Sequence, residues 1–278
     1  MKTIGIIGLG VMGASFASRL SHKGYTVYGF ERSQETLDIA LQNQIIQKGT
    51  TEPETLLKEC DLIIIALYPT QILPWIRQYQ HACKDKAILM DISGVKSNII
   101  KPVQAVLRED LELISIHPMC GRESRGIQFS DETIFDQANY IVVPTDQNTP
   151  EAIELAKQLG VILGVKNIST LSIEEHDRMI GFLSQLTHVI AVSLMNTHEN
   201  AHLVKYTGDS FRDLTRIAEI NEDLWSELFL LNKEILLDET DQFIASIQHF
   251  RDVLNQEDVE EMKRLFIQST KRRKLFNR

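Results

Sequence analysis

The sequence predicts an α/β protein in which a doubly wound, mainly parallel sheet is followed by an all-helical domain. Over about the first 165 residues, short β-branched runs alternate with amphipathic segments, the pattern of repeated strand–helix units. Runs such as residues 62–65 are apolar throughout, as expected of a strand buried on both faces of a parallel sheet. Beyond residue 170 only helical periods remain. Since 278 residues exceed the usual size of one core, we expect two domains, residues 1–168 and 169–278.

The individual elements follow from local patterns. The expected strands are residues 3–7, 26–30, 62–66, 87–91, 113–116 and 139–143. Amphipathic segments between them predict helices at 11–22, 33–43, 53–59 and 95–107. Ser169, Thr170 and Ser172 offer N-caps to a long helix over 173–196. Further amphipathic helices are expected at 224–237, 241–254 and 259–269.

Composition and charge argue against several classes of protein. The formal net charge of −9 speaks against a nucleic acid as the main ligand, and the basic residues 271–274 are expected to form a solvated helix end. Three widely spaced cysteines, Cys60, Cys83 and Cys120, provide neither a disulfide framework nor a thiolate zinc site. With no run of roughly 18 apolar residues and no signal peptide, we expect a cytoplasmic protein without a membrane segment.

A glycine-rich turn follows the first predicted strand. Gly8, Gly10 and Gly13 have the G-x-G-x-x-G spacing of a Rossmann-type dinucleotide-binding turn, between an apolar strand and an amphipathic helix. Gly8 permits the turn, Gly10 lets a pyrophosphate approach the backbone, and Gly13 lets the helix pack on the strand. The helix N-terminus adds N–H donors for the anion. The cofactor contacts expected here are Gly8, Leu9, Gly10, Val11, Met12 and Gly13.

An acidic residue at the end of the second predicted strand favours NAD over NADP. Glu31 lies 18 residues beyond Gly13, close to the roughly 20 expected of the acid that binds the ribose hydroxyls. Its carboxylate would repel a 2′-phosphate. Arg32, the next residue, keeps NADP as an alternative.

Two polar segments follow predicted strands at the edge where such sheets bind ligands. Asp91-Ile92-Ser93-Gly94-Val95-Lys96 comes after strand 87–91, and His117-Pro118-Met119-Cys120-Gly121-Arg122-Glu123 comes after strand 113–116. Pro118 disfavours a helix, so we expect His117 to be displayed at the sheet edge rather than packed within it. An imidazole beside a dinucleotide site is a candidate general base.

With these motifs the sequence resembles the prephenate and arogenate dehydrogenases of tyrosine biosynthesis. The resemblance covers essentially the whole chain: the glycine motif, the D-x-x-x-V-K segment, the H-P-M-x-G segment and residues 211–218 (FRDLTRIA). It implies oxidation of prephenate to 4-hydroxyphenylpyruvate with loss of carbon dioxide and hydride transfer to NAD. Oxidation of arogenate to tyrosine is the alternative. It also implies a homodimer formed by the helical domain, and we expect no regulatory domain after it.

The resemblance assigns roles to individual residues. His117 is the base that removes the proton of the ring hydroxyl. Arg216 matches the arginine that grips a substrate carboxylate with two parallel hydrogen bonds, and Asp213 matches a residue that orients it. Trp225 matches an aromatic residue of the site that can come from the partner subunit, with helix packing as the alternative role. Two further substrate contacts are implied, Glu123 and His188.

The chain departs from the family pattern at several positions. Many relatives have a serine at the place of Gly94, where its hydroxyl bonds both the histidine and the substrate oxygen. Here Ser93 lies one residue earlier, so either Ser93 takes over as a catalytic residue or that hydrogen bond is missing. Gln185 and Thr187 replace a histidine and a proline, and Cys120 stands where alanine is frequent and is expected to be a small packing residue.

Three other readings stay open on the sequence. His198, Glu199 and His202 fit the H-E-x-x-H pattern of zinc proteases, although we expect no metal. A β-hydroxyacid dehydrogenase would place a lysine on the first long helix of the second domain, and residues 173–196 contain none. A non-catalytic dinucleotide sensor would bind NAD and tolerate loss of His117.

Overall fold

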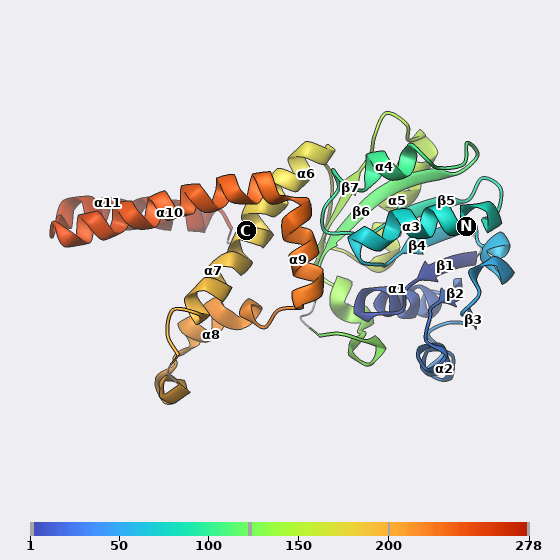
Figure 1. The fold of residues 1–278 in the computed structure, drawn as a ribbon, viewed down its shortest axis with the longest axis horizontal. Coiled ribbons are helices and arrows are strands. Elements are labelled where there is room, and N and C mark those ends of the chain that lie inside the picture. Colours follow the sequence, from blue (N-terminus) through green and yellow to red (C-terminus); the bar gives the residue numbers. More distant parts are fainter. Residues whose placement is uncertain (1–2, 122–123, 200, 277–278) are drawn as a thin grey trace. The chain divides into compact units, whose positions relative to one another are not determined.

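The computed structural model describes residues 3–121, 124–199 and 201–276. Residues 1–232 and residues 233–278 form two compact units. The first unit contains a single eight-stranded sheet with the strand order β3-β2-β1-β4-β5-β6-β7-β8, in which only the β6–β7 pair is antiparallel (Figure 1). The strands are β1 (Thr3–Ile7), β2 (Thr26–Phe30), β3 (Lys48–Thr50), β4 (Leu62–Ile65), β5 (Ile88–Asp91), β6 (Glu112–Met119), β7 (Asn139–Val143) and β8 (Asn167–Thr170).

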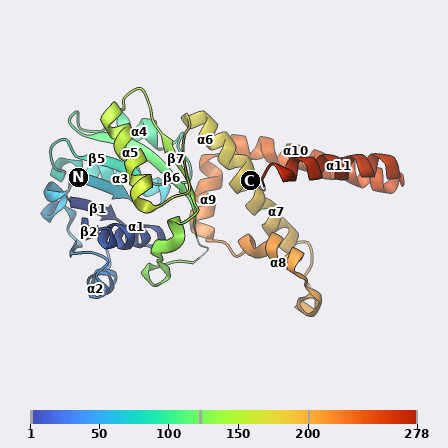
Figure 2. The same ribbon diagram turned by 180° about the vertical axis from the view of Figure 1, so that it is seen from behind.

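Helices cover both faces of this sheet. One face packs on α1 (Val11–His22), α2 (Gln34–Gln42) and α5 (Pro150–Leu163), and the other on α3 (Pro69–Tyr79) and α4 (Ile100–Gln104). Helix α3 faces the viewer in Figure 1 and α5 in Figure 2. In β4, Leu62 and Ile64 enter one core while Ile63 and Ile65 enter the other, and all four are fully buried. The doubly wound fold predicted from continuous apolar strands is therefore confirmed.

Some local expectations were wrong. Residues 53–59 form two short 3₁₀ turns, Pro53–Thr55 and Leu57–Glu59, rather than a helix. Only Ile100–Gln104 is helical within the segment 95–107, because Val95 and Lys96 belong to a buried polar turn. Strand β6 extends to Met119, so Pro118 lies within a strand and pairs with Tyr140 of β7.

A long helix begins directly after the sheet. Ser172 and Glu175 form a capping box at the start of α6 (Ile173–Ile180), which continues through a π-helical turn (Gly181–Gln185) into α7 (Leu186–Met195). By length and composition this helix could cross a membrane, with an 18-residue window of mean hydropathy 1.3 that is 28% buried. Polar residues divide it, so it contains no uninterrupted apolar run of the length expected of a membrane span. Core helices of soluble proteins can have the same length and apolar composition.

The remainder of the first unit crosses back toward the sheet. It consists of a 3₁₀ turn (Ala201–Tyr206), α8 (Asp209–Thr215), a second 3₁₀ turn (Arg216–Ala218) and α9 (Glu222–Leu231). Helix α9 reaches the first part of the chain through several polar contacts. Asn221 donates to the Tyr68 hydroxyl at 3.1 Å, and Glu227 accepts from the Thr70 amide at 3.1 Å.

The second unit is a pair of helices, α10 (Lys233–Asn255) and α11 (Val259–Lys274), that pack on each other. The rings of Phe250 and Phe266 lie 6.2 Å apart between them. Asp258 caps α11 through the amide of Glu261. The helix predicted at 224–237 is divided, since α9 ends at Leu231 and α10 begins at Lys233.

Candidate functional site

The glycine turn has the geometry that a dinucleotide requires. Gly8 adopts φ +86°, and a Cβ on Gly13 would lie 1.9 Å from the carbonyl oxygen of Gly8, so α1 packs on the turn only with glycine there. A Cβ on Gly10 would meet no atom within 4 Å. Gly10 is the N-cap of α1, and Val11 and Met12 form its first turn. The exposed backbone at Gly10 and the helix N-terminus together form a cradle for an anion.

A pocket of about 630 Å³ opens beside this turn at the carboxyl ends of β1, β2 and β4. Glu31 and Arg32 line it together with Gly8 and Gly10. One Glu31 oxygen accepts from the Leu9 amide at 2.9 Å and the other from the Arg32 amide at 2.7 Å. Its further lining residues, which the sequence did not indicate, include Thr51, Pro53, Tyr68, Gln71, Trp75 and Tyr79.

His117 lies on β6 where this strand continues past its neighbour. The β5–β6 pairing ends with Asp91 opposite Ser115, two residues before His117. On its other side His117 pairs with Ile141 of β7. The expected position at the carboxyl edge of the sheet is thus correct, but the side chain is half-buried and hydrogen-bonded rather than simply displayed.

Three side chains, His117, His176 and Asp177, form a hydrogen-bonded series that leads from the sheet edge into the interior. Nδ1 of His117 lies 2.9 Å from Nε2 of His176, and Nδ1 of His176 lies 2.7 Å from Oδ1 of Asp177. His176 and Asp177 are buried in the first turns of α6. The other hydrogen bonds of Asp177 come from the Lys96 amide at 2.9 Å, the Ser97 amide at 2.8 Å and the Ser97 hydroxyl.

The surroundings of these three side chains keep His117 and His176 neutral and the Asp177 carboxylate charged. Burial lowers the pKa of His117 well below its usual 6.5, and nearby His176 and Lys96 lower it further. Burial also lowers the pKa of His176, although Asp177 opposes the effect. Burial alone would raise the pKa of Asp177, but hydrogen bonds from His176 and Ser97 outweigh it and hold this pKa below its usual value. A neutral imidazole at position 117 can accept a proton.

A second buried polar cluster fixes the loop after β5. Lys96 and Asp91 are both completely buried and pair at 3.1 Å, and Nζ of Lys96 also donates to the Ile116 carbonyl at 2.9 Å. The Ser115 hydroxyl donates to the other Asp91 oxygen. Because Ile116 directly precedes His117, this cluster helps to position the β6 backbone at the candidate base.

Ser93 belongs to that cluster and not to the surroundings of His117. Its hydroxyl bonds Asp91 and lies 2.8 Å from the Val95 carbonyl. Of the two alternatives for Ser93, these contacts favour the second, a missing hydrogen bond to His117, because the Ser93 side chain is committed to the loop after β5. A Cβ on Gly94, in contrast, would lie 3.9 Å from Cε1 of His117 and 3.3 Å from Leu228 of α9. Position 94 faces His117, and glycine provides no hydroxyl there.

Two predicted substrate residues meet on α7 and α9 of the same chain. The rings of His188 and Trp225 stack with centroids 3.6 Å apart and planes inclined by 29°. Nδ1 of His188 lies 2.8 Å from the Ser184 carbonyl. Trp225 is one helical turn before Leu228, the residue beside Gly94, so these two residues share one face of α9.

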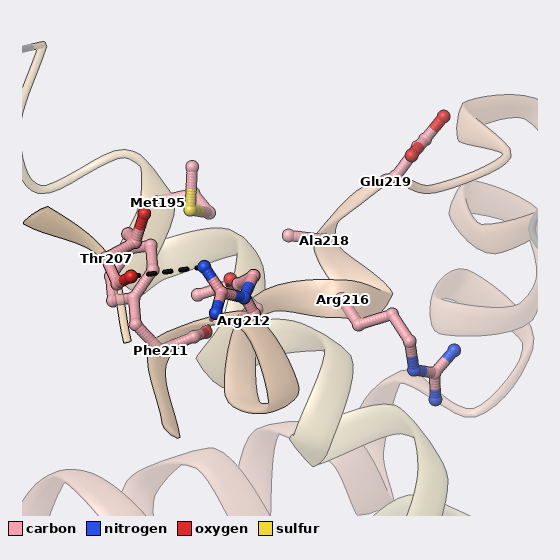
Figure 3. Close-up of a pocket in the computed structure, with 8 residues that line it drawn as sticks. Met195, Thr207, Phe211, Arg212, Arg216, Ala218 and Glu219 are labelled. Carbon is pink, nitrogen blue, oxygen red and sulfur yellow. Dashed lines mark hydrogen bonds between the residues drawn. The ribbon is translucent and has the colours of Figure 1, made fainter. Parts of the chain in front are cut away.

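Asp213 and Arg216 lie between the two stacked residues in the sequence, at exposed positions of α8 and of the turn that follows it. Arg216 lines a pocket of about 480 Å³ with Arg212, Phe211, Thr215 and Glu219. Figure 3 shows its side chain extending away from Arg212, which instead bonds the Thr207 carbonyl at 3.1 Å.

Some predicted positions cannot be placed or do not form a site. Glu123 lies outside the residues that the structure describes. His198 and Glu199 precede the 3₁₀ turn that carries His202, so the H-E-x-x-H residues do not share one face of an α-helix. Within residues 3–121, 124–199 and 201–276, no group of three His, Cys, Asp or Glu side chains could hold a metal ion.

Sequence reasoning missed His176, Asp177, Asn232 and the inward role of Gln185. Asn232 donates to the Asp177 carbonyl at 3.0 Å and to Oε1 of Gln185 at 2.7 Å, while Gln185 donates to the Leu228 carbonyl at 2.9 Å. All four are buried. An adjacent His-Asp pair just after a capping box was the available signal, but helical periodicity alone could not show that both face inward.

Family models match almost the whole chain. A model described as prephenate dehydrogenase, nucleotide-binding domain, matches residues 16–169, and one described as prephenate dehydrogenase, dimerization domain, matches residues 172–268. A prephenate dehydrogenase of Bacillus subtilis is 29% identical over 273 residues, 95% of this chain and 73% of that protein.

Solved structures give the same result. A prephenate dehydrogenase from A. aeolicus, in complex with hydroxyphenyl propionate and NAD⁺, is 25% identical and superposes with a TM-score of 0.90 over 100% of this chain and 99% of that one. The arogenate dehydrogenase of Synechocystis, 24% identical, has the same fold with a TM-score of 0.83 over 99% of each chain. Together with the two family models, these likenesses show that the chain belongs to the prephenate dehydrogenase family of NAD-dependent oxidoreductases.

Proposed function

We propose that this protein oxidises and decarboxylates prephenate to 4-hydroxyphenylpyruvate with NAD as the hydride acceptor, in tyrosine biosynthesis. The observation that carries the proposal is a neutral imidazole, His117, at the carboxyl edge of a dinucleotide-binding sheet in a chain of this family. The arogenate reaction is the same chemistry on an amino rather than a keto side chain, and it is the second candidate.

The chain fits the cofactor through its backbone. Open space at Gly10 and the glycine-only packing at Gly13 leave the start of α1 accessible to a pyrophosphate. In the proposed complex, the amides at residues 10–13 bind the pyrophosphate, while Leu9, whose own amide holds Glu31, contributes backbone to the turn. Glu31 accepts from the ribose hydroxyls, which favours NAD over NADP. Arg32 is the residue that a 2′-phosphate would use. The bound nicotinamide supplies the hydride-accepting ring.

His117 handles the proton. As the C–H hydrogen of the ring carbinol leaves with its electron pair, His117 takes the hydroxyl proton, and a ring ketone forms. Loss of carbon dioxide then returns the electrons of the broken C–C bond to the ring, and the ketone oxygen becomes a phenol oxygen. That oxygen recovers the proton from His117, so the base ends the cycle neutral.

The remaining predicted residues would hold the substrate. Arg216 is proposed to grip a carboxylate, oriented by Asp213, because a net charge of −9 makes a placed cation necessary for a dianionic substrate. The stacked pair His188 and Trp225 would pack against the ring or side chain, and Glu123 would be a polar contact.

We also propose domain limits, a dimer and a cellular location for the protein. The proposed domain limits are residues 1–168 and 169–278, a division supported by the two family models, which match residues 16–169 and 172–268. A homodimer through the helical region would cover its exposed apolar side chains, among them Phe182, Leu183 and Met195, each at least 44% exposed. The protein is proposed to be cytoplasmic, with a small-molecule substrate and no nucleic-acid or membrane partner.

The proposal is tested by four parallel reactions that pair prephenate or arogenate with NAD or NADP. We expect formation of reduced nicotinamide, carbon dioxide and 4-hydroxyphenylpyruvate to be fastest with prephenate and NAD. Faster turnover of arogenate, with tyrosine as product, would favour the second candidate. Reduction in none of the four mixtures, by protein that binds NAD, would contradict both and leave a β-hydroxyacid dehydrogenase or a dinucleotide sensor.

A further inference from the structure

We infer that His176 is a positioning residue that fixes His117 in the tautomer with hydrogen on Nδ1, and that Asp177 holds His176 in turn. Nε2 of His117 is then the atom that takes the substrate proton. The catalytic consequence rests on the proposed function. The tautomer itself is a property of this chain.

Asp177 sets the direction of the hydrogen bonds. Its carboxylate accepts from the amides of Lys96 and Ser97 and from the Ser97 hydroxyl, so both oxygens already face donors. A proton on either oxygen would oppose one of these donors. The carboxylate is therefore an acceptor toward His176 as well, and Nδ1 of His176 carries hydrogen.

His176 transmits this polarity to His117. A neutral imidazole with hydrogen on Nδ1 has a lone pair on Nε2. Nε2 of His176 lies 2.9 Å from Nδ1 of His117, so Nδ1 of His117 must be the donor in this hydrogen bond. The neutral His117 ring then has its lone pair on Nε2, the nitrogen on the opposite side of the ring from His176.

The residues at positions 93 and 94 offer the His117 ring no hydroxyl, so its hydrogen bond with His176 becomes more important. Gly94 faces His117 without a hydroxyl, and the Ser93 hydroxyl is committed to Asp91 and Val95. His176 is thus the side chain that the structure shows holding the His117 ring by a hydrogen bond. The buried Asn232 amide holds the other side of Asp177 by donating to its carbonyl, and Gln185 in turn accepts from Asn232.

Two substitutions separate this role from simple packing. His176→Leu fills a similar volume but offers no acceptor, and His176→Gln keeps an acceptor oxygen. We expect kcat for prephenate to fall by about 10²–10⁴-fold in His176→Leu, the range for a general base that is lost or held in the wrong tautomer. His176→Gln should recover kcat to within about tenfold of wild type, and KM and NAD affinity should change little in both. Replacement of the exposed His81 by glutamine is the matched control.

The tautomer is measured directly by ¹⁵N NMR of histidine side chains in the full-length protein, with the His117 signals assigned by their loss in His117→Asn. The wild type should show hydrogen on Nδ1 and a bare Nε2 at His117, and His176→Leu should show the other tautomer appear. An Nε2-protonated His117 in the wild type, or a wild-type kcat in His176→Leu, would overturn the inference. If His176→Leu does not fold, the wild-type spectrum and the kcat of His176→Gln still test the tautomer of His117 and the role of His176. Absence of prephenate turnover in a protein with the expected tautomer would count against the proposed function alone.

Discussion

The cofactor edge and the surroundings of His117 are built in different ways. At the cofactor edge, one stretch of six residues forms the turn, and its decisive features are backbone φ angles and the absence of side chains at Gly8, Gly10 and Gly13. Around His117, buried side chains from the loop after β5, from β6, from α6 and from α9 meet through hydrogen bonds. The first site is local: a Cβ at Gly13 would clash with the Gly8 carbonyl, whereas one at Gly10 would take up the space left for the cofactor. The second is assembled from distant segments and depends on each polar group having its partner.

The buried pair Asp91–Lys96 should give the largest effect on stability. Asp91→Asn leaves the Lys96 ammonium without a carboxylate in a site where both residues are fully buried. Removing one partner of a buried ion pair costs about 3–5 kcal/mol, measurable by urea unfolding. The exposed pair Lys48–Glu59 is the control, since Lys48→Met should change stability little. Equal effects of the two substitutions would show that burial does not distinguish the pairs.

Two of the three glycines of the turn, Gly10 and Gly13, should respond differently to alanine. Gly13→Ala places Cβ against the Gly8 carbonyl, and overpacking of this kind costs about 1–3 kcal/mol. Gly10→Ala meets open space, so its stability should stay within about 1 kcal/mol of wild type. NAD affinity of Gly10→Ala should nevertheless fall about tenfold or more, since the methyl group occupies the path of the pyrophosphate. Unfolding and NAD titration of both variants check this. An unchanged NAD affinity in Gly10→Ala would place the cofactor elsewhere.

Acid should lower the free energy of unfolding because His117 and His176 are neutral in the folded protein. The pKa values of His117 and His176 lie below 6.5 in the folded protein because of burial, whereas in the unfolded chain they return toward 6.5. Above that pH both states are neutral there. Below it the unfolded state binds more protons, so stability falls with falling pH until the folded pKa is reached. Unfolding free energies at about pH 7.5 and about pH 5.5 should differ more for wild type than for His117→Asn. The opposite ranking would contradict a buried neutral His117.

Gly94→Ser should have the smallest effect. Gly94 is not in the left-handed region, and the new Cβ displaces only the end of the Leu228 side chain, 3.3 Å away. The lower entropy of the unfolded chain offsets part of that contact, by about 0.4–1 kcal/mol. Since His176 already holds His117, we expect kcat to change by no more than about tenfold, or 1.4 kcal/mol. A rise of kcat beyond about 100-fold would mean that His117 is poorly held without the hydroxyl.

The same contrast explains how much of the fold and of the candidate site could be predicted from the sequence. The glycine turn, Glu31 and six of the strands are marked by residues close together in the chain, and the structure has them at or near the expected limits. Strands β3 and β8 were missed because they are edge strands of three and four residues without a continuous apolar pattern.

The supporting residues of His117 could not be predicted for a physical reason. His176 and Asp177 are polar residues in the first turns of an amphipathic helix, where a solvated position is the usual expectation. Only the tertiary fold brings His176 to β6 and Asp177 to the loop of Lys96 and Ser97, 81 and 80 positions away along the chain. The two alternatives for Ser93 could not be decided from the sequence for the same reason, because spacing cannot show that its hydroxyl bonds Asp91.

The central claim is that His117 performs proton transfer in a site whose cofactor edge is independent of it. The most direct test compares wild type and His117→Asn in prephenate-dependent NAD reduction, with NAD affinity of both proteins measured by calorimetry. We predict that kcat falls on the order of 10²–10⁴-fold in the variant while NAD affinity is unchanged. A variant that retains more than about a tenth of the wild-type kcat would contradict the assignment of His117 as the base.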